Sequence, residues 1–117
     1  MVNLTNLMSL NGAVSAAECT SDGSHISYIV KDDQTQDLDK MTERLCAINT
    51  LVATIVESFN RIGELNWTPF HGWSIAAGDY SVFVANHIVL IVETDKADLK
   101  EIYRVLHEEA RLTLEAA

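Results

Sequence analysis

The sequence predicts an α+β fold, in which a five-stranded antiparallel sheet lies between helices in the order α-β-β-α-β-β-β-α. Three observations support this prediction. Apolar residues recur at steps of three and four from Leu38 to Ile62, as in one long amphipathic helix. Two pairs of short apolar segments flank Asp22-Gly23 and Gly78-Asp79, which are typical of hairpin turns. The continuously apolar run from Ile88 to Val92 indicates a central strand that is covered on both faces.

The first elements are short. Leucine and methionine residues within 4–10 fall at helical spacing, and Gly12 follows where a left-handed residue ends many helices. Residues 13–18 and 25–31 are then two extended segments joined by the Asp22-Gly23 turn. These residues therefore predict a short helix followed by a β-hairpin.

The helix predicted over residues 38–62 carries two stripes. The first is apolar and wide enough to lie on a sheet. The second consists of small side chains, which let another backbone approach closely. A second copy of the chain is one candidate for that neighbour, and the edge of the chain's own core is the other. The first stripe consists of Leu38, Met41, Leu45, Ile48, Val52, Ile55, Phe59 and Ile62, and the second of Thr42, Cys46, Asn49 and Ala53.

Three further strands and a last helix complete the chain. The strands are expected at residues 73–77, 80–85 and 88–92, with a glycine-first, type II′ turn at Gly78-Asp79. Asp95 is expected to cap the last helix, whose apolar face includes Ile102 and Leu106. With 117 residues, of which 48% are hydrophobic, the chain fits one domain over 1–117.

Charge and hydropathy exclude several classes of partner. Eight basic residues against 17 acidic ones give a net charge of -9, which disfavours nucleic acid and anionic membrane surfaces. No apolar run approaches the ~20 residues of a membrane span, and polar residues interrupt the N-terminal segment where a signal peptide needs an apolar core. A cytoplasmic location is therefore expected.

No residues form a recognisable catalytic, cofactor or metal motif. The four histidines fall on different predicted elements or turns, away from ligand spacing to one another or to a cysteine. The sequence therefore predicts a protein that is not an enzyme and has no cofactor. Cys19 and Cys46 lack CxxC spacing and are expected to be reduced thiols rather than a disulfide. Cys46 is interpreted as a small buried hydrophobe, or alternatively as a residue near a two-fold axis that meets its own copy.

Aromatic residues gather where the chain approaches its third strand, and tryptophan and tyrosine are favoured anchors of protein interfaces. A partner-binding surface is therefore one interpretation. The other is that the two tryptophans fill the core and that the Gly-Asp pair only forms a turn. The candidate partner-binding residues are Trp67, Pro69, His71, Trp73, Asp79 and Tyr80.

The spacing Leu7-x-x-Leu10-x-Gly12-x-x-x-Ala16 before a strand, together with the Asp22-Gly23 hairpin, resembles the roadblock/dynein-light-chain superfamily. The run NWTPFHGWSIAAGDYSVFVAN, residues 66–86, resembles a small bacterial branch of that superfamily, which is a domain of unknown function.

This resemblance implies a homodimer built from the long helices and neighbouring edge strands, with the stripe Thr42, Cys46, Asn49 and Ala53 at the dimer interface. It also implies a non-catalytic scaffold or regulator that binds a protein partner, for which a small Ras-like GTPase is one candidate. The element order is shared with profilin-like and longin folds. The alternative function is therefore a profilin-like sensor that holds a small ligand in a cavity under the sheet.

Overall fold

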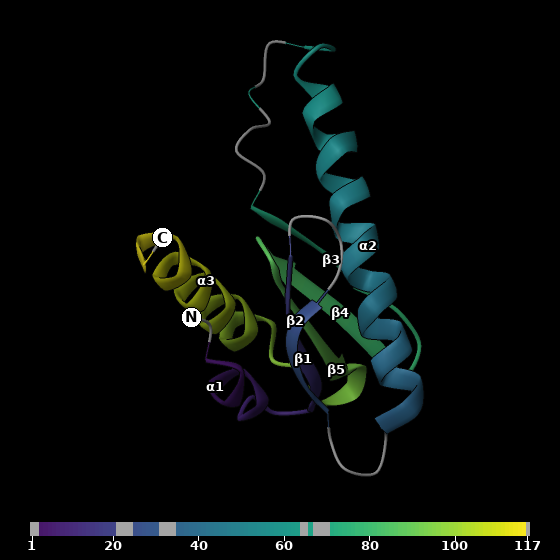
Figure 1. Cartoon of the computed structure of the whole chain (residues 1–117). Coiled ribbons are helices and arrows are strands. Elements are labelled where there is room, and N and C mark those ends of the chain that lie inside the picture. Colours follow the sequence, from purple (N-terminus) through teal and green to yellow (C-terminus); the bar gives the residue numbers. More distant parts are fainter. Residues whose placement is uncertain (1–2, 21–24, 31–34, 64–65, 67–70, 117) are drawn as a thin grey trace.

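The computed structural model of the chain describes residues 3–20, 25–30, 35–63, 66 and 71–116, and it confirms the predicted order of elements (Figure 1). The elements are α1 (Leu4–Met8), β1 (Ala13–Cys19), β2 (His25–Val30), α2 (Thr35–Phe59), β3 (Gly72–Ala76), β4 (Tyr80–Ala85), β5 (Ile88–Glu93), the 3-10 turn η2 (Thr94–Lys96) and α3 (Leu99–Ala116).

One antiparallel sheet has the strand order β2-β1-β5-β4-β3. The predicted central strand is confirmed, because β5 lies between β1 and β4 and its residues Leu90, Ile91 and Val92 are fully buried. A run without polar side chains can occupy this place because both of its faces are covered. In this sheet β2 and β3 are the edge strands.

Helices cover the two faces of the sheet in separate layers. Figure 1 shows α2 on one face and both α1 and α3 on the other. Alternate residues of β5 accordingly enter two cores: Leu90 and Val92 pack with α1 and α3, whereas Val89 and Ile91 pack with residues of α2. The C-terminal part of α2 extends beyond the strands (Figure 1).

A register shift in β1 lies next to a residue that contacts α2. The pairing of β1 with β5 shifts between Ala13 and Ser15, as at a β-bulge. Ser15 then faces α2, and its hydroxyl lies 3.2 Å from the hydroxyl of Thr42. These small side chains leave room for the helix backbone, so the close neighbour of the small-residue stripe is the chain's own β1.

The stripe of small residues on α2 therefore lies on the sheet, where the sequence analysis expected the apolar stripe. Thr42, Cys46 and Asn49 are 0%, 1% and 6% exposed, and Ala53 is half-buried. The first three lie inside the fold of a single chain, in the core beneath α2, as in the alternative in which this stripe packs at the edge of the chain's own core. Conversely, much of the apolar stripe that was expected to lie on the sheet is exposed. Among its described residues, only Leu45 is fully buried.

The two cysteines form a disulfide, so the prediction of a reduced thiol pair is wrong. Cys19 ends β1 and Cys46 lies on α2, and their Cα atoms are 5.5 Å apart. This separation is typical of disulfides. The pairing depends on the contact between β1 and the small-residue stripe, which the spacing of cysteines along the chain does not reveal.

The predicted signals at the ends of elements are only partly confirmed. Gly12 has φ +83°, as its predicted left-handed conformation requires, whereas Gly78 does not have a positive φ and the expected type II′ turn is wrong. Asp95 lies in η2. Asp98 instead accepts a hydrogen bond at 3.4 Å from the backbone N–H of Glu101, in the first turn of α3.

Candidate interaction surface

Hydrogen bonds of the Asn49 side chain connect the edge strand β3 to α2. The indole Nε1 of Trp73 donates a hydrogen bond of 2.8 Å to Oδ1 of Asn49, whose Nδ2 donates one of 2.8 Å to the backbone oxygen of Asn86. Asn86 has φ +52°, in the turn between β4 and β5. The indole of Trp73 is half-buried against the core beneath α2. This geometry matches the alternative interpretation, in which the tryptophan serves the fold.

On the opposite face of the sheet, a hollow of about 300 Å³ lies between β3 and α3. Tyr103 borders it, with its ring edge-on to Phe83 and stacked with His107 at 6.2 Å between centroids. The Tyr103 hydroxyl lies 3.3 Å from that of Ser74. We call this the β3–α3 hollow, and its lining consists of His71, Gly72, Trp73, Ser74, Val84, Ala85, Tyr103, Leu106 and His107.

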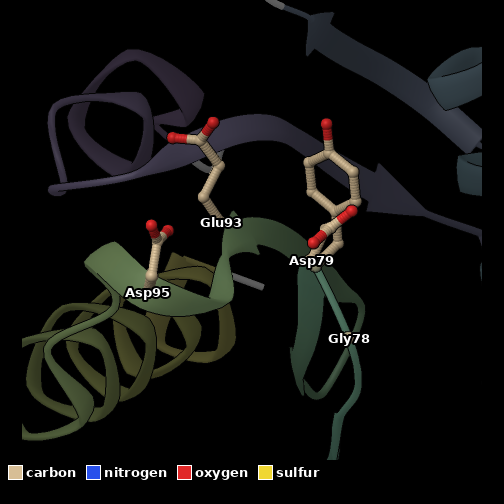
Figure 2. A pocket seen from close by; sticks show the side chains of 5 residues that line it. Gly78, Asp79, Glu93 and Asp95 are labelled. Atoms are coloured by element: carbon tan, nitrogen blue, oxygen red, sulfur yellow. The ribbon is translucent and has the colours of Figure 1, made fainter.

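A second hollow, of about 370 Å³, lies at the other end of β3 and is lined by Gly78, Asp79, Tyr80, Glu93 and Asp95. Figure 2 shows the carboxylates of Glu93 and Asp95 on one side of this acidic hollow and that of Asp79 on the other. Beside it, the ammonium group of Lys96 lies 2.9 Å from a carboxylate oxygen of Glu93. That hydrogen bond and the carboxylate's charge raise the pKa of Lys96 above its ordinary value.

The predicted partner-binding residues therefore divide between two places. His71 and Trp73 line the β3–α3 hollow, whereas Asp79 and Tyr80 line the acidic hollow beyond the opposite end of β3. Trp67 and Pro69 lie outside the described residues. The structure thus brings these residues together as two pairs, one at each end of the edge strand.

Large exposed apolar side chains on α2, together with Ile62 in the turn just after it, form a surface that the sequence analysis mostly expected to lie on the sheet. We call it the outer stripe; it consists of Met41, Leu51, Ile55 and Ile62, which are 36%, 59%, 46% and 79% exposed. Its centre lies roughly a third of a turn around the helix from the buried face. Ile75 of β3, 47% exposed, pairs with Val82 and so lies on the same sheet face as α2. The sequence contains a signal for this exposed surface, because the apolar arc of α2 is wider than contact with one sheet needs.

Charged residues on α3 form exposed ion pairs. Arg104 pairs with Glu101 and lies 3.5 Å from Glu108. Its hydrogen bond lowers the pKa of Glu101 below the ordinary value and raises that of the guanidinium. These groups are exposed, so the pairs add little to stability.

The part of the chain that the structure describes contains no group of three or more histidine, cysteine or acidic side chains that could hold a metal ion. His71, His87 and His107 are exposed. Among the described helices, none combines the length and apolar character needed to cross a bilayer.

Comparison with known proteins identifies the fold and a family. The profile of a family described as "Uncharacterized conserved protein (DUF2173)" matches residues 3–108. The chain is similar to a Roadblock/LC7 domain from Streptomyces avermitilis, with a TM-score of 0.73 and 11% identity over 97% of this chain and 92% of that one. Among curated proteins, none matches this sequence.

Two structures of MglB are similar as well. MglB in a tetrameric arrangement gives a TM-score of 0.69 with 17% identity over 97% of this chain and 87% of that one. The gliding protein MglB from Thermus thermophilus gives 0.69 with 16% identity over 96% and 86%. At these identities the likeness establishes the fold, and the predicted roadblock architecture is confirmed.

Proposed function

The chain belongs to the DUF2173 family of uncharacterized conserved proteins, and we infer that it works as a homodimeric, non-catalytic protein-interaction module on a roadblock fold. The observation that carries this proposal is the outer stripe. Leu51 and Ile55 on α2 are 59% and 46% exposed, and Ile62, just after the end of the helix, is 79% exposed. Contiguous exposed apolar residues mark surfaces that a partner covers.

A second copy of the chain is the occupant that fits this surface best. The outer stripe lies on the same side of the sheet as Ile75, on the edge strand β3. An edge strand presents unpaired backbone groups that another strand can complete. In a two-fold dimer the same patch meets itself, so one helix and one edge strand from each copy supply both halves of the interface. Self-association on this fold has a precedent in the tetrameric arrangement of MglB.

Once the outer stripe is covered by a second copy, the other surfaces remain for a different protein. The two hollows flank β3, and the acidic hollow carries three carboxylates within a chain of net charge -9. A partner with basic residues is therefore favoured at that end. The resemblance to roadblock proteins makes a small Ras-like GTPase the first candidate.

Cross-linking tests the dimer at the level of single residues. Because the native cysteines are joined to each other, an added thiol at Leu51→Cys or Ile55→Cys is the site where a short bismaleimide reacts. We expect a covalent dimer from at least one of these variants and none from Thr50→Cys, which lies on the polar side of α2. Equal cross-linking of all three, or of none, would contradict the proposed interface.

The β3–α3 hollow supports the second candidate function, a small-ligand sensor. It has about 300 Å³ and is bordered by the hydroxyl groups of Ser74 and Tyr103 and by two histidines. Pockets for small molecules combine an apolar lining with a few polar groups in this way. Thermal melts against a metabolite panel test it, because a ligand at 100 times its Kd stabilises the protein by about 2.7 kcal/mol. No stabilisation by any compound would leave the interaction module as the function.

A further inference from the structure

We propose that the Cys19–Cys46 disulfide is a reversible clamp that sets how firmly α2 is held on the sheet, and that a dithiol reductant opens it. The bond joins the last residue of β1 to the middle of α2, and both residues are buried. It closes a loop that contains β2 and the first half of α2, with a sequence separation of 27. The clamp itself is independent of the proposed function, but its consequence for dimerisation depends on it.

Few of the apolar side chains that the structure describes on the long helix are fully buried. Among the described side chains of α2, residues 40–59, Leu45 and Cys46 are the fully buried apolar ones. The shorter α3 is held by more, namely Ile102, Val105, Leu106 and Ala110. Because buried apolar area is a main source of attachment between a helix and a sheet, the disulfide adds to a small set of fully buried apolar contacts on α2.

The fold can also tolerate the open bond. Free cysteines behave as small buried hydrophobes, so two thiols can stay in the core once rotation of the side chains separates the two sulfurs. One turn before Cys46, Thr42 contacts Ser15, and one turn after it, Asn49 binds Trp73. These polar contacts keep the helix in register when the bond is broken. Reduction is therefore expected to loosen α2 without unfolding the sheet.

The chemistry is ordinary thiol–disulfide exchange. One thiolate of an external dithiol attacks a sulfur of the disulfide, forms a mixed disulfide and releases the other cysteine, which takes up a proton. The second thiol of the reductant then attacks the mixed disulfide, so the protein gains two thiols and the dithiol becomes a disulfide. The cytoplasmic location expected from the sequence would expose the protein to such dithiols. Disulfides in that compartment are typically transient or redox-sensing.

The clamp bears on the proposed dimer because the outer stripe belongs to the same helix. Ile55 lies nine positions after Cys46 in the sequence, which is about two and a half helical turns. A helix that rocks on the sheet moves the outer stripe relative to Ile75 of β3. The reduced protein is therefore expected to form a weaker dimer than the oxidised protein.

Hydrogen exchange followed by mass spectrometry tests the clamp without relying on the dimer. The oxidised protein is compared with protein reduced by dithiothreitol and with Cys46→Ser, and alkylation confirms the thiol state. We expect exchange within residues 40–59 to rise at least about tenfold on reduction and that of α3 to stay unchanged. Dithiothreitol should change nothing further in Cys46→Ser. Equal exchange of α2 in the oxidised and reduced proteins would overturn the proposal, as would a bond that is reduced only when the whole chain unfolds.

Sedimentation of the same samples then tests the link to dimerisation. We expect the Kd of the dimer to rise on reduction. An unchanged Kd alongside faster exchange of α2 would overturn the regulatory link. A monomer in both states would refute the proposed function, while the exchange result would still decide whether the clamp exists.

Discussion

The indole Nε1 of Trp73 and Oδ1 of Asn49, 2.8 Å apart, join the edge strand β3 to the long helix α2. Asn49 is 6% exposed, so its Oδ1 has little access to water in this structure. We expect Trp73→Phe to lower the free energy of unfolding by about 1–3 kcal/mol, since it leaves a buried acceptor unsatisfied. Chemical denaturation measures this loss.

A double-mutant cycle with Asn49→Ala isolates the hydrogen bond between these two residues. We expect a coupling energy of about 1 kcal/mol between Trp73→Phe and Asn49→Ala. Additive losses would show that the indole contributes only by its volume.

Gly72 and Gly78 offer a matched pair of substitutions near the two ends of β3. A Cβ at Gly72 would overlap the backbone oxygen of Val84, whereas one at Gly78 would meet nothing within 4 Å. Gly72→Ala is therefore expected to cost about 1–3 kcal/mol and to displace the edge strand. Gly78→Ala should change stability by less than about 1 kcal/mol. Thermal unfolding of both variants checks this, and equal melting temperatures would contradict the tight approach of β3 to β4.

Glu109 attaches the N-terminal helix α1 to α3. Its carboxylate accepts hydrogen bonds from the backbone N–H of Asn3 at 2.9 Å and from Nδ2 of Asn6 at 3.1 Å, and the residue is 6% exposed. We expect Glu109→Ala to cost about 2 kcal/mol, because two donors lose a charged acceptor. Glu108→Ala, at an exposed neighbouring position, should cost less than about 0.5 kcal/mol. Urea unfolding distinguishes them, and similar losses would argue against a specific anchor.

The predicted fold needed only local patterns, which explains why it was right. The apolar run of β5 and the three-four repeat of α2 are properties of consecutive residues, and both elements are present. β5 lies where its pattern predicted, whereas α2 spans Thr35–Phe59 rather than residues 38–62, so the repeat did not fix the ends of the helix. The predicted orientation of α2 on the sheet was wrong. The helix carries one apolar stripe and one stripe of small side chains, and either could face the sheet. Leu45, which is buried, lies at the border between the two stripes. In the structure the small-residue stripe faces the sheet, where Ser15 of β1, next to the register shift, contacts Thr42.

The disulfide was also not predicted from the sequence, because the orientation of α2 on the sheet was not known. Its formation requires β1 and the small-residue stripe to be in contact, and no spacing of cysteines along the chain encodes that contact. The partner-binding prediction grouped residues that are close in sequence, but β3 separates His71 from Asp79 by the length of the strand. Sequence proximity could not reveal that the two lie in different hollows.

The pair of Arg104 and Glu101 predicts a dependence on pH. The pKa of Glu101 is lowered, first by the hydrogen bond from Arg104. A lowered pKa means that the stabilising contribution is present above the ordinary value and is lost as the pH falls through the folded-state pKa. We expect Arg104→Gln to raise the pKa of Glu101 toward its ordinary value, as measured by carboxyl NMR titration. Lys96→Gln removes a distant positive charge as a control, and an equal shift in both variants would refute the local pairing.

The central claim is that the outer stripe of α2 joins two copies of the chain, and sedimentation equilibrium at micromolar concentration tests it most directly. The wild-type chain and Thr50→Arg should sediment at twice the monomer mass of 13.0 kDa. Ile55→Arg should sediment as a monomer with unchanged secondary structure, because burying an unpaired charge at the interface is strongly unfavourable. A wild-type chain that sediments at 13.0 kDa, or a dimer that survives Ile55→Arg, would contradict the claim.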